Sequence, residues 1–188
     1  TSVYESLIYG EDEKLPIFKR LKNVLDIVFA EKEDLYLRDT IFDDNREYYE
    51  KLGKNFVEAL NDMLVLDAVI MNTDRHFGNF GFIIDNKTNK IVAPAPLFDH
   101  GNALLNFAGR DDLESDKALS AYAETLVPCV YDDFIGTAKK VLTQKHRDGL
   151  RKLLGFKFRK NSRYNLPDKR LKKLEKMIQT RAKVLLEK

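Results

Sequence analysis

The sequence predicts a mainly α-helical fold that carries one small β-hairpin. Apolar residues recur at helical spacing along most of the 188-residue chain. One stretch departs from that spacing, because residues 80–93 form two short apolar runs separated by the turn sequence Asn86-Lys87-Thr88-Asn89. The last third of the chain divides into four helical segments, and turn residues separate them.

The first part of the chain predicts three helices. Residues Leu15 to Phe29 carry apolar side chains three and four positions apart, with Pro16 in a first turn that tolerates proline. Asp43-Asp44-Asn45 offers side chains that cap a second helix, and we expect Gly53 to interrupt it. Asn55 to Met71 is apolar nearly all round, which is typical of a buried central helix.

A loop and a hairpin follow the central helix. The two glycines in residues 78–81 favour a loop over continued helix. Phe80 to Asp85 and Lys90 to Ala93 are then predicted to pair as the two strands of the hairpin. The prolines of Pro94-Ala95-Pro96 impose extended backbone that leads to Asp99.

The last third predicts four helices with partly basic faces. Asp132 and Asp168 are expected to be N-cap residues. His146, which lies between two basic residues, is expected to face solvent. The four helices are predicted over Ser115–Leu126, Asp132–Leu142, Gln144–Leu154 and Asp168–Leu186. The apolar face of the last one is marked by Leu171, Leu174, Ile178, Arg181 and Leu185.

The net charge of +2 conceals a strong asymmetry along the chain. Residues 139–188 hold 18 Lys or Arg and four Asp or Glu, so the preceding residues are net acidic. Such a basic region has two interpretations: solvated helix faces that pair with the acidic part of the protein, or a surface for nucleic acid or another anionic partner. The candidates for phosphate contact are Arg159, Lys160, Arg163, Lys169, Arg170 and Lys173.

Composition excludes several classes of protein. Cys129 is the only cysteine, which excludes an intrachain disulfide and a cysteine-rich zinc site. The longest apolar-rich run, Met63 to Met71, is too short to span a bilayer. No basic and then apolar leader pattern follows Thr1. We therefore expect a cytoplasmic protein that makes no membrane contact.

The most informative stretch follows the central helix. It places Asp74, then Asn79 five residues later, and Asp99 twenty residues after that. Phosphoryl transfer needs this set, because a carboxylate orients the attacking hydroxyl and two oxygen ligands hold magnesium. Each residue taken alone also fits an ordinary turn or capping role. The order and spacing of the three together favour the catalytic interpretation.

The local sequence resembles one kinase family. Asp74-Arg75-His76-x-x-Asn79, followed by Ala93 to Phe98 and by Asp99-His100-Gly101, is similar to the catalytic and metal-binding loops of HipA-like bacterial Ser/Thr kinases. The Asp-Arg-His-x-x-Asn loop also resembles that of phosphoinositide-kinase-like proteins. The resemblance implies that residues 1–188 form a single C-terminal lobe of the protein-kinase-like (HipA/phosphoinositide-kinase-like) fold. Its catalytic and metal-binding loops would occupy residues 72–101, and its basic helical region residues 131–188.

The resemblance also implies roles for individual residues. Asp74 would be the catalytic base and His76 a supporting residue of the same loop. Asn79 and Asp99 would bind the nucleotide cofactor through Mg²⁺, so that the γ-phosphate of ATP passes to a hydroxyl of a protein substrate. HipA-like kinases act with a DNA-binding antitoxin partner in toxin–antitoxin systems, so contact with nucleic acid would be indirect.

Two alternatives stay open. Lipid kinase activity uses the same chemistry. The chain would otherwise be a non-catalytic regulatory module that binds DNA or a repressor partner through its basic C-terminal helices. The residues before Asp74 contain no glycine-rich loop and no strand-borne lysine like that of a kinase N-terminal lobe. We therefore expect that lobe to be absent from this chain, and the chain alone to bind ATP weakly.

Overall fold

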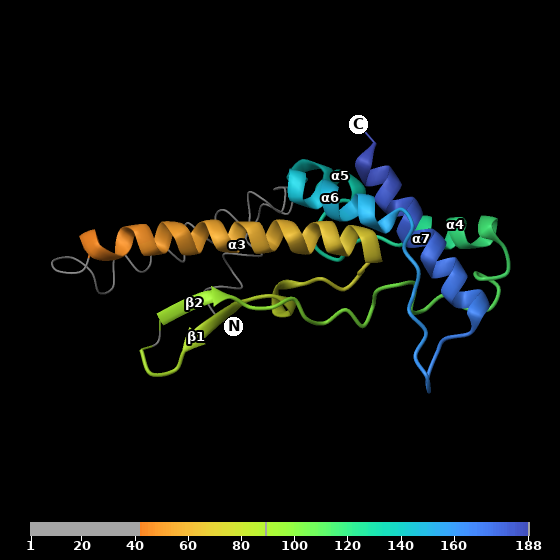
Figure 1. Cartoon of the computed structure of the whole chain (residues 1–188), viewed down its shortest axis with the longest axis horizontal. Helices are drawn as coiled ribbons and strands as arrows, with labels where there is room; N and C mark the ends of the chain where they lie inside the picture. Colours follow the sequence, from red (N-terminus) through yellow and green to blue (C-terminus); the bar gives the residue numbers. More distant parts are fainter. Residues whose placement is uncertain (1–41, 89, 188) are drawn as a thin grey trace. The chain divides into compact units, whose positions relative to one another are not determined.

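The computed structural model describes residues 42–88 and 90–187. The helix predicted over Leu15–Phe29 lies outside these residues. Within them the chain is mainly helical and contains a two-stranded antiparallel hairpin (Figure 1). The described residues pack as two compact units. One includes residues 42–58 and 82–94, and the other includes residues 59–81 and 95–187.

The first described helix, α3, runs without a break from Phe42 to Ile70. The predicted interruption at Gly53 is therefore wrong. Glycine costs a helix interior only about 1 kcal/mol relative to alanine, and each residue added to an existing helix gains a hydrogen bond. The helix continues into its buried C-terminal half, where Met63, Leu64 and Ala68 are at most 1% exposed.

Helix α3 ends in a left-handed turn. Met71 has a φ of 55°, and the backbone N–H of Asn72 donates to the carbonyl oxygen of Asp67 at 3.2 Å. This is the closing hydrogen bond of a Schellman motif, in which glycine usually takes the left-handed position. Met71 instead accepts the strained conformation while its side chain is buried. The turn directs the chain into the predicted catalytic loop.

Four further helices build the core of the second unit. They are α4 (Asp116–Thr125), α5 (Phe134–Val141), α6 (Gln144–Leu153) and α7 (Asp168–Leu186). Helix α7 packs against α5 and α6 (Figure 1). Its predicted apolar face is buried at Leu174, Ile178 and Leu185, and the core also includes Val65, Val69, Leu119, Phe134 and Leu150. Among the described helices, none is long and apolar enough to cross a membrane.

The predicted helix caps need three corrections. Asp43, Asp44 and Asn45 do not precede a helix, because they already lie within α3. Asp133, not Asp132, caps α5 by accepting a hydrogen bond from the backbone N–H of Gly136. Pro167 occupies the N-cap position of α7, and Asp168 is the first residue of that helix. A carboxylate in the first turn still interacts favourably with the helix dipole. The errors at α5 and α7 are shifts of one residue, which spacing alone does not resolve.

The expected exposure of His146 is wrong. Its side chain is 8% exposed, and its Nε2 lies 2.7 Å from Oδ1 of Asp62 on α3. Its Nδ1 accepts a hydrogen bond from the backbone N–H of Thr143 at 3.0 Å, which forms a capping box at the start of α6. The histidine therefore joins two helices whose residues are 84 positions apart.

The predicted hairpin is confirmed. Strands β1 (Phe82–Asp85) and β2 (Lys90–Pro94) pair antiparallel, with Phe82 opposite Pro94 and Asp85 opposite Lys90. The register shifts between Ile83 and Ile84, which indicates a β-bulge. Residues on either side of the hairpin are joined by a hydrogen bond from the Ala95 N–H to the Gly81 carbonyl at 2.8 Å.

Candidate active site

Arg75 is the structural centre of the candidate site. Its side chain is fully buried, and all five of its N–H donors have acceptors. Nε and Nη2 donate to the two carboxylate oxygens of Asp67 at 2.8 and 3.0 Å. Nη1 donates to the carbonyl oxygens of Asn79 and Phe98, both at 2.8 Å, and Nη2 lies 2.9 Å from Nδ1 of His100. One guanidinium therefore joins α3, the predicted catalytic loop and the predicted metal-binding loop.

The Arg75–Asp67 ion pair is shielded from solvent, and all the Arg75 donors have hydrogen-bond acceptors. The two side chains are 1% and 0% exposed, and Asp67 also accepts a hydrogen bond from Nδ2 of Asn72 at 3.3 Å. A buried ion pair is tolerated only when its remaining hydrogen-bonding capacity is satisfied. The sequence holds one signal for this pair, the carboxylate of Asp67 inside the apolar run Met63–Met71, because a buried carboxylate needs a partner. It holds no signal that names Arg75 as that partner.

Asp74 presents a carboxylate that is held at one oxygen. Nδ2 of Asn102 donates to its Oδ2 at 2.9 Å, and the Asp74 backbone N–H donates to Oδ1 of Asn72 at 3.3 Å. Within residues 42–88 and 90–187, no donor is hydrogen-bonded to Oδ1 of Asp74. The side chain is half-buried. Asp74 therefore keeps one oriented acceptor that an incoming hydroxyl can use.

Asn79 is buried, with 3% of the residue exposed, and it is oriented by Asp74. Its Nδ2 donates to the Asp74 backbone carbonyl at 2.8 Å, so its Oδ1 is the atom left to act as a ligand. Asn79 ends a short 3₁₀ turn, η1 (Phe77–Asn79). This tight turn brings the amide back toward the residue five positions earlier.

His76 has a capping position in the structure. It is exposed, and its Nδ1 accepts a hydrogen bond from the Gly78 N–H at 3.1 Å, which caps η1. A Cβ atom at position 78 would lie 2.9 Å from Cε1 of His76, so a larger residue there would require the His76 ring to shift. Among the described residues, no hydrogen bond or ion pair joins the ring to the Asp74 carboxylate. The structure therefore offers one way in which His76 could support the site: it stabilises the turn that carries Asn79.

Asp99 lies beside this loop in an uncommon backbone conformation. Its φ is 57°, a left-handed value that aspartate tolerates better than most residues. The Asp99 carbonyl accepts a hydrogen bond from Nδ2 of Asn72 at 3.4 Å, and its exposed side chain has no hydrogen-bond partner within the described part of the chain. The neighbouring Phe98 carbonyl shares its donor, Arg75 Nη1, with Asn79.

The donor atoms of Asn79 and Asp99 fit a magnesium ion that arrives with a nucleotide. Mg²⁺ prefers oxygen ligands, and it usually takes one or two from the protein and the rest from phosphates and water. Among the described residues, no group of three or more His, Cys, Asp or Glu side chains could hold a metal. The pair therefore suits a shared site with phosphate and not an all-protein cage.

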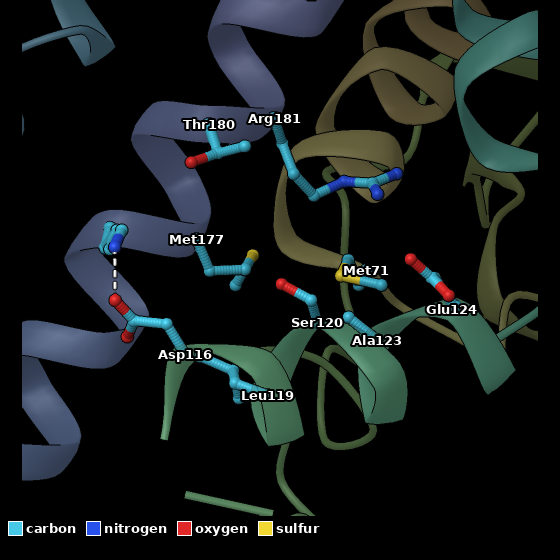
Figure 2. A pocket seen from close by; sticks show the side chains of 10 residues that line it. Met71, Asp116, Leu119, Ser120, Ala123, Glu124, Met177, Thr180 and Arg181 are labelled. Carbon is cyan, nitrogen blue, oxygen red and sulfur yellow. Dashed lines mark hydrogen bonds and ion pairs between the residues drawn. The ribbon is translucent and has the colours of Figure 1, made fainter.

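A cavity of about 350 Å³ lies between α4 and α7 (Figure 2). Its apolar lining includes Met71, Leu119 and Met177, and a hydrogen-bonded pair, Asp116–Lys176, lies at its edge. None of Asp74, His76, Asn79 and Asp99 lines it. Among the residues that the structure describes, the cavity is linked to the candidate site only through Met71, which lines the cavity and immediately precedes the predicted catalytic loop.

The basic region is partly neutralised within the fold. Of the predicted phosphate-contact residues, Lys160 pairs with Asp168 and Lys173 pairs with Asp116. Arg170 donates to the backbone carbonyls of Leu105, Asn106 and Ala108. The contacts of these three residues favour the first interpretation of the basic region, in which its charges pair with groups of the protein itself. Arg159, Arg163 and Lys169 are exposed.

Comparison with known proteins supports a kinase relationship. Over 105 residues, the chain is 34% identical to "Serine/threonine-protein kinase CtkA" of Helicobacter pylori (strain J99). That relative is a protein kinase. The match covers 55% of this chain and 30% of the relative, so the chain corresponds to about a third of that protein's length. No family model matches the chain, and no solved structure matches it.

Proposed function

We propose that this chain is the catalytic lobe of a HipA-like Ser/Thr kinase that transfers the γ-phosphate of ATP to a protein hydroxyl. The observation that carries the proposal is the arrangement around Arg75. One guanidinium joins the loop of Asp74 and Asn79 to the loop of Asp99. The relationship to a serine/threonine kinase supports the same reaction class.

In the proposed reaction, Oδ1 of Asp74 accepts a hydrogen bond from the substrate hydroxyl. The hydroxyl oxygen attacks the γ-phosphorus and forms a new P–O bond, while the bond from that phosphorus to the β,γ-bridging oxygen breaks and ADP leaves. The hydroxyl proton passes to Asp74. A positioned base of this kind contributes about 10²- to 10⁴-fold in rate.

Asn79 and Asp99 would hold the metal, and a bound Mg²⁺ would offset negative charge on the phosphate oxygens. Asn79 contributes a neutral amide oxygen whose direction is fixed by the contact between its Nδ2 and the Asp74 carbonyl. Asp99 contributes the anionic oxygen. Because Arg75 positions the backbone at Asn79 and Phe98, both ligands depend on one buried side chain.

The test measures Mg²⁺-dependent ATP binding and phosphate transfer to protein, in this chain and in the product of the gene that encodes it. Asp74→Asn should lower transfer at least 100-fold and leave Mg²⁺-ATP binding unchanged. Asp99→Asn should weaken the Mg²⁺-dependent part of the binding. Asp148→Asn, which removes an exposed carboxylate that pairs with Arg151, is the matched control. Full transfer by Asp74→Asn would refute the proposal.

A second candidate function is a regulatory module that binds DNA or a DNA-binding repressor partner through the basic region. The exposed side chains of Arg159, Arg163 and Lys169 favour it. If this is the main role, Asp74→Asn leaves the biological activity intact. Replacing the three basic residues would then weaken DNA binding and flatten its dependence on salt. With each phosphate contact that is lost, binding releases fewer counterions from the DNA.

A further inference from the structure

We infer that Asn102 is a positioning residue that fixes which oxygen of Asp74 meets the substrate hydroxyl. The inference rests on the proposed function. Nδ2 of Asn102 donates to Oδ2 of Asp74 at 2.9 Å. A carboxylate on a single bond can rotate, and a hydrogen bond to one oxygen restricts that rotation. Oδ1 is then the oxygen that remains for the substrate.

The backbone of Asn102 is held against the same loop. Its carbonyl oxygen accepts hydrogen bonds from the backbone N–H of Thr73 at 3.5 Å and from Oγ1 of Thr73 at 3.4 Å. Asn102 therefore contacts two consecutive residues, through its main chain and its side chain. The position of its amide relative to Asp74 is set by the backbone and does not depend on a flexible side chain alone.

The segment after Asn102 is kept in a strained conformation. Leu104 and Leu105 both have a φ of 54°, and left-handed backbone costs a non-glycine residue roughly 1–2 kcal/mol. Two bulky residues in succession are unusual there. Strain of this kind persists only where the surroundings impose it, and it occurs often at functional sites.

The surroundings that impose the strain can be identified. The Leu104 N–H donates to the Ile70 carbonyl at the end of α3 at 2.7 Å, and Leu105 is 1% exposed. Nη2 of Arg170 on α7 donates to the Leu105 carbonyl at 2.7 Å. These contacts hold Leu104 and Leu105 against α3 and α7. Asn102 lies just before these two residues, so its backbone is restrained as well. The geometry points to a rigid support for the Asp74 carboxylate.

The test compares steady-state kinetics of Asn102→Ala and Asn106→Ala in the product of the gene. Asn106 is an exposed asparagine in the same segment whose side chain makes no hydrogen bond within residues 42–88 and 90–187. For Asn102→Ala we expect kcat to fall about 10- to 100-fold, which is the cost of removing a residue that orients a metal ligand through a hydrogen bond and which we take as the scale for orienting a base. KM for ATP, the Mg²⁺ dependence and the melting temperature should match those of Asn106→Ala.

The outcomes separate the two proposals. If the wild type transfers phosphate and Asn102→Ala has an unchanged kcat, the role of Asn102 is refuted and the proposed function is not. A parallel loss of kcat and ATP affinity would indicate general disruption and also refutes it. Absence of transfer in the wild type overturns the proposed function and this inference with it. An independent readout is the side-chain amide NMR signal of Asn102, which should shift in Asp74→Asn while the Asn106 signal stays in place.

Discussion

The buried ion pair between Asp67 and Arg75 gives the sharpest stability prediction. Asp67→Asn keeps the shape of the side chain but removes its charge, and it turns one acceptor atom into an NH₂ group that faces the Arg75 donors. Arg75 is then a buried guanidinium without a counter-charge. Breaking a buried pair by removing one partner costs about 3–5 kcal/mol, and the 1% and 0% exposure of the two side chains places this pair in that class.

The loss is measurable by thermal unfolding followed by circular dichroism. For a chain of this size, each kcal/mol shifts the melting temperature by about 2–4 °C, so we expect a decrease of roughly 6–20 °C. Asp148→Asn on α6 is the matched control, because it is the same substitution in an exposed ion pair. The Asp148 side chain is 58% exposed and pairs with Arg151, which is 55% exposed. A surface pair of this kind contributes at most about 1 kcal/mol.

One result would refute the reasoning. If Asp67→Asn and Asp148→Asn destabilise the protein equally, by no more than about 1 kcal/mol, then water reaches the guanidinium and the Asp67–Arg75 pair is not shielded from solvent. The central place given to Arg75 in the site would then be wrong as well.

Three further predictions follow from particular contacts. Leu104→Gly should be more stable than Leu104→Ala by about 1 kcal/mol, the reverse of the usual order, because glycine removes the left-handed strain; equal stability in thermal melts would contradict this. Hydrogen bonds from Lys173 and Lys176 lower the pKa of Asp116 to about 2, so this carboxylate stabilises the fold above pH 4 and loses that effect between about pH 4 and pH 2. Asp116→Asn should therefore melt below the wild type at pH 7 in low salt and level with it at pH 2, and a gap that persists at pH 2 would count against the ion pair. Arg170→Met should increase proteolysis between residues 104 and 108, because three carbonyl contacts are lost; an unchanged cleavage pattern would show that the segment does not need them.

The secondary structure of the described residues was largely predictable because it depends on local signals. The hairpin follows from two apolar runs around a polar turn, and the last four helices follow from apolar spacing. The break expected at Gly53 failed because the cost of one glycine is smaller than the cooperative gain of a long helix. His146 was misread because its partner, Asp62, is 84 residues away.

The sequence suggests reactive groups for the candidate site but not the residues that support them. The order and spacing of Asp74, Asn79 and Asp99 indicate a catalytic set, and their roles stay predictions. Asp67, Arg75 and Asn102 were not identified as a support, because their contacts join segments between 8 and 28 residues apart and only the fold brings them together. Residues that act through others leave no fixed spacing in a sequence.

The hydrogen bond between Ala95 and Gly81 has a consequence for how such a chain can vary. It closes the base of the hairpin, while Arg75 joins the segments on either side. The site therefore does not depend on the length of the hairpin that connects these two segments. Doubling the length of a loop costs only about 0.6 kcal/mol in closure entropy. The turn at Asn86, Lys87 and Thr88 is exposed. It is a natural place for insertions during evolution, and for an epitope or fluorescent label in the laboratory.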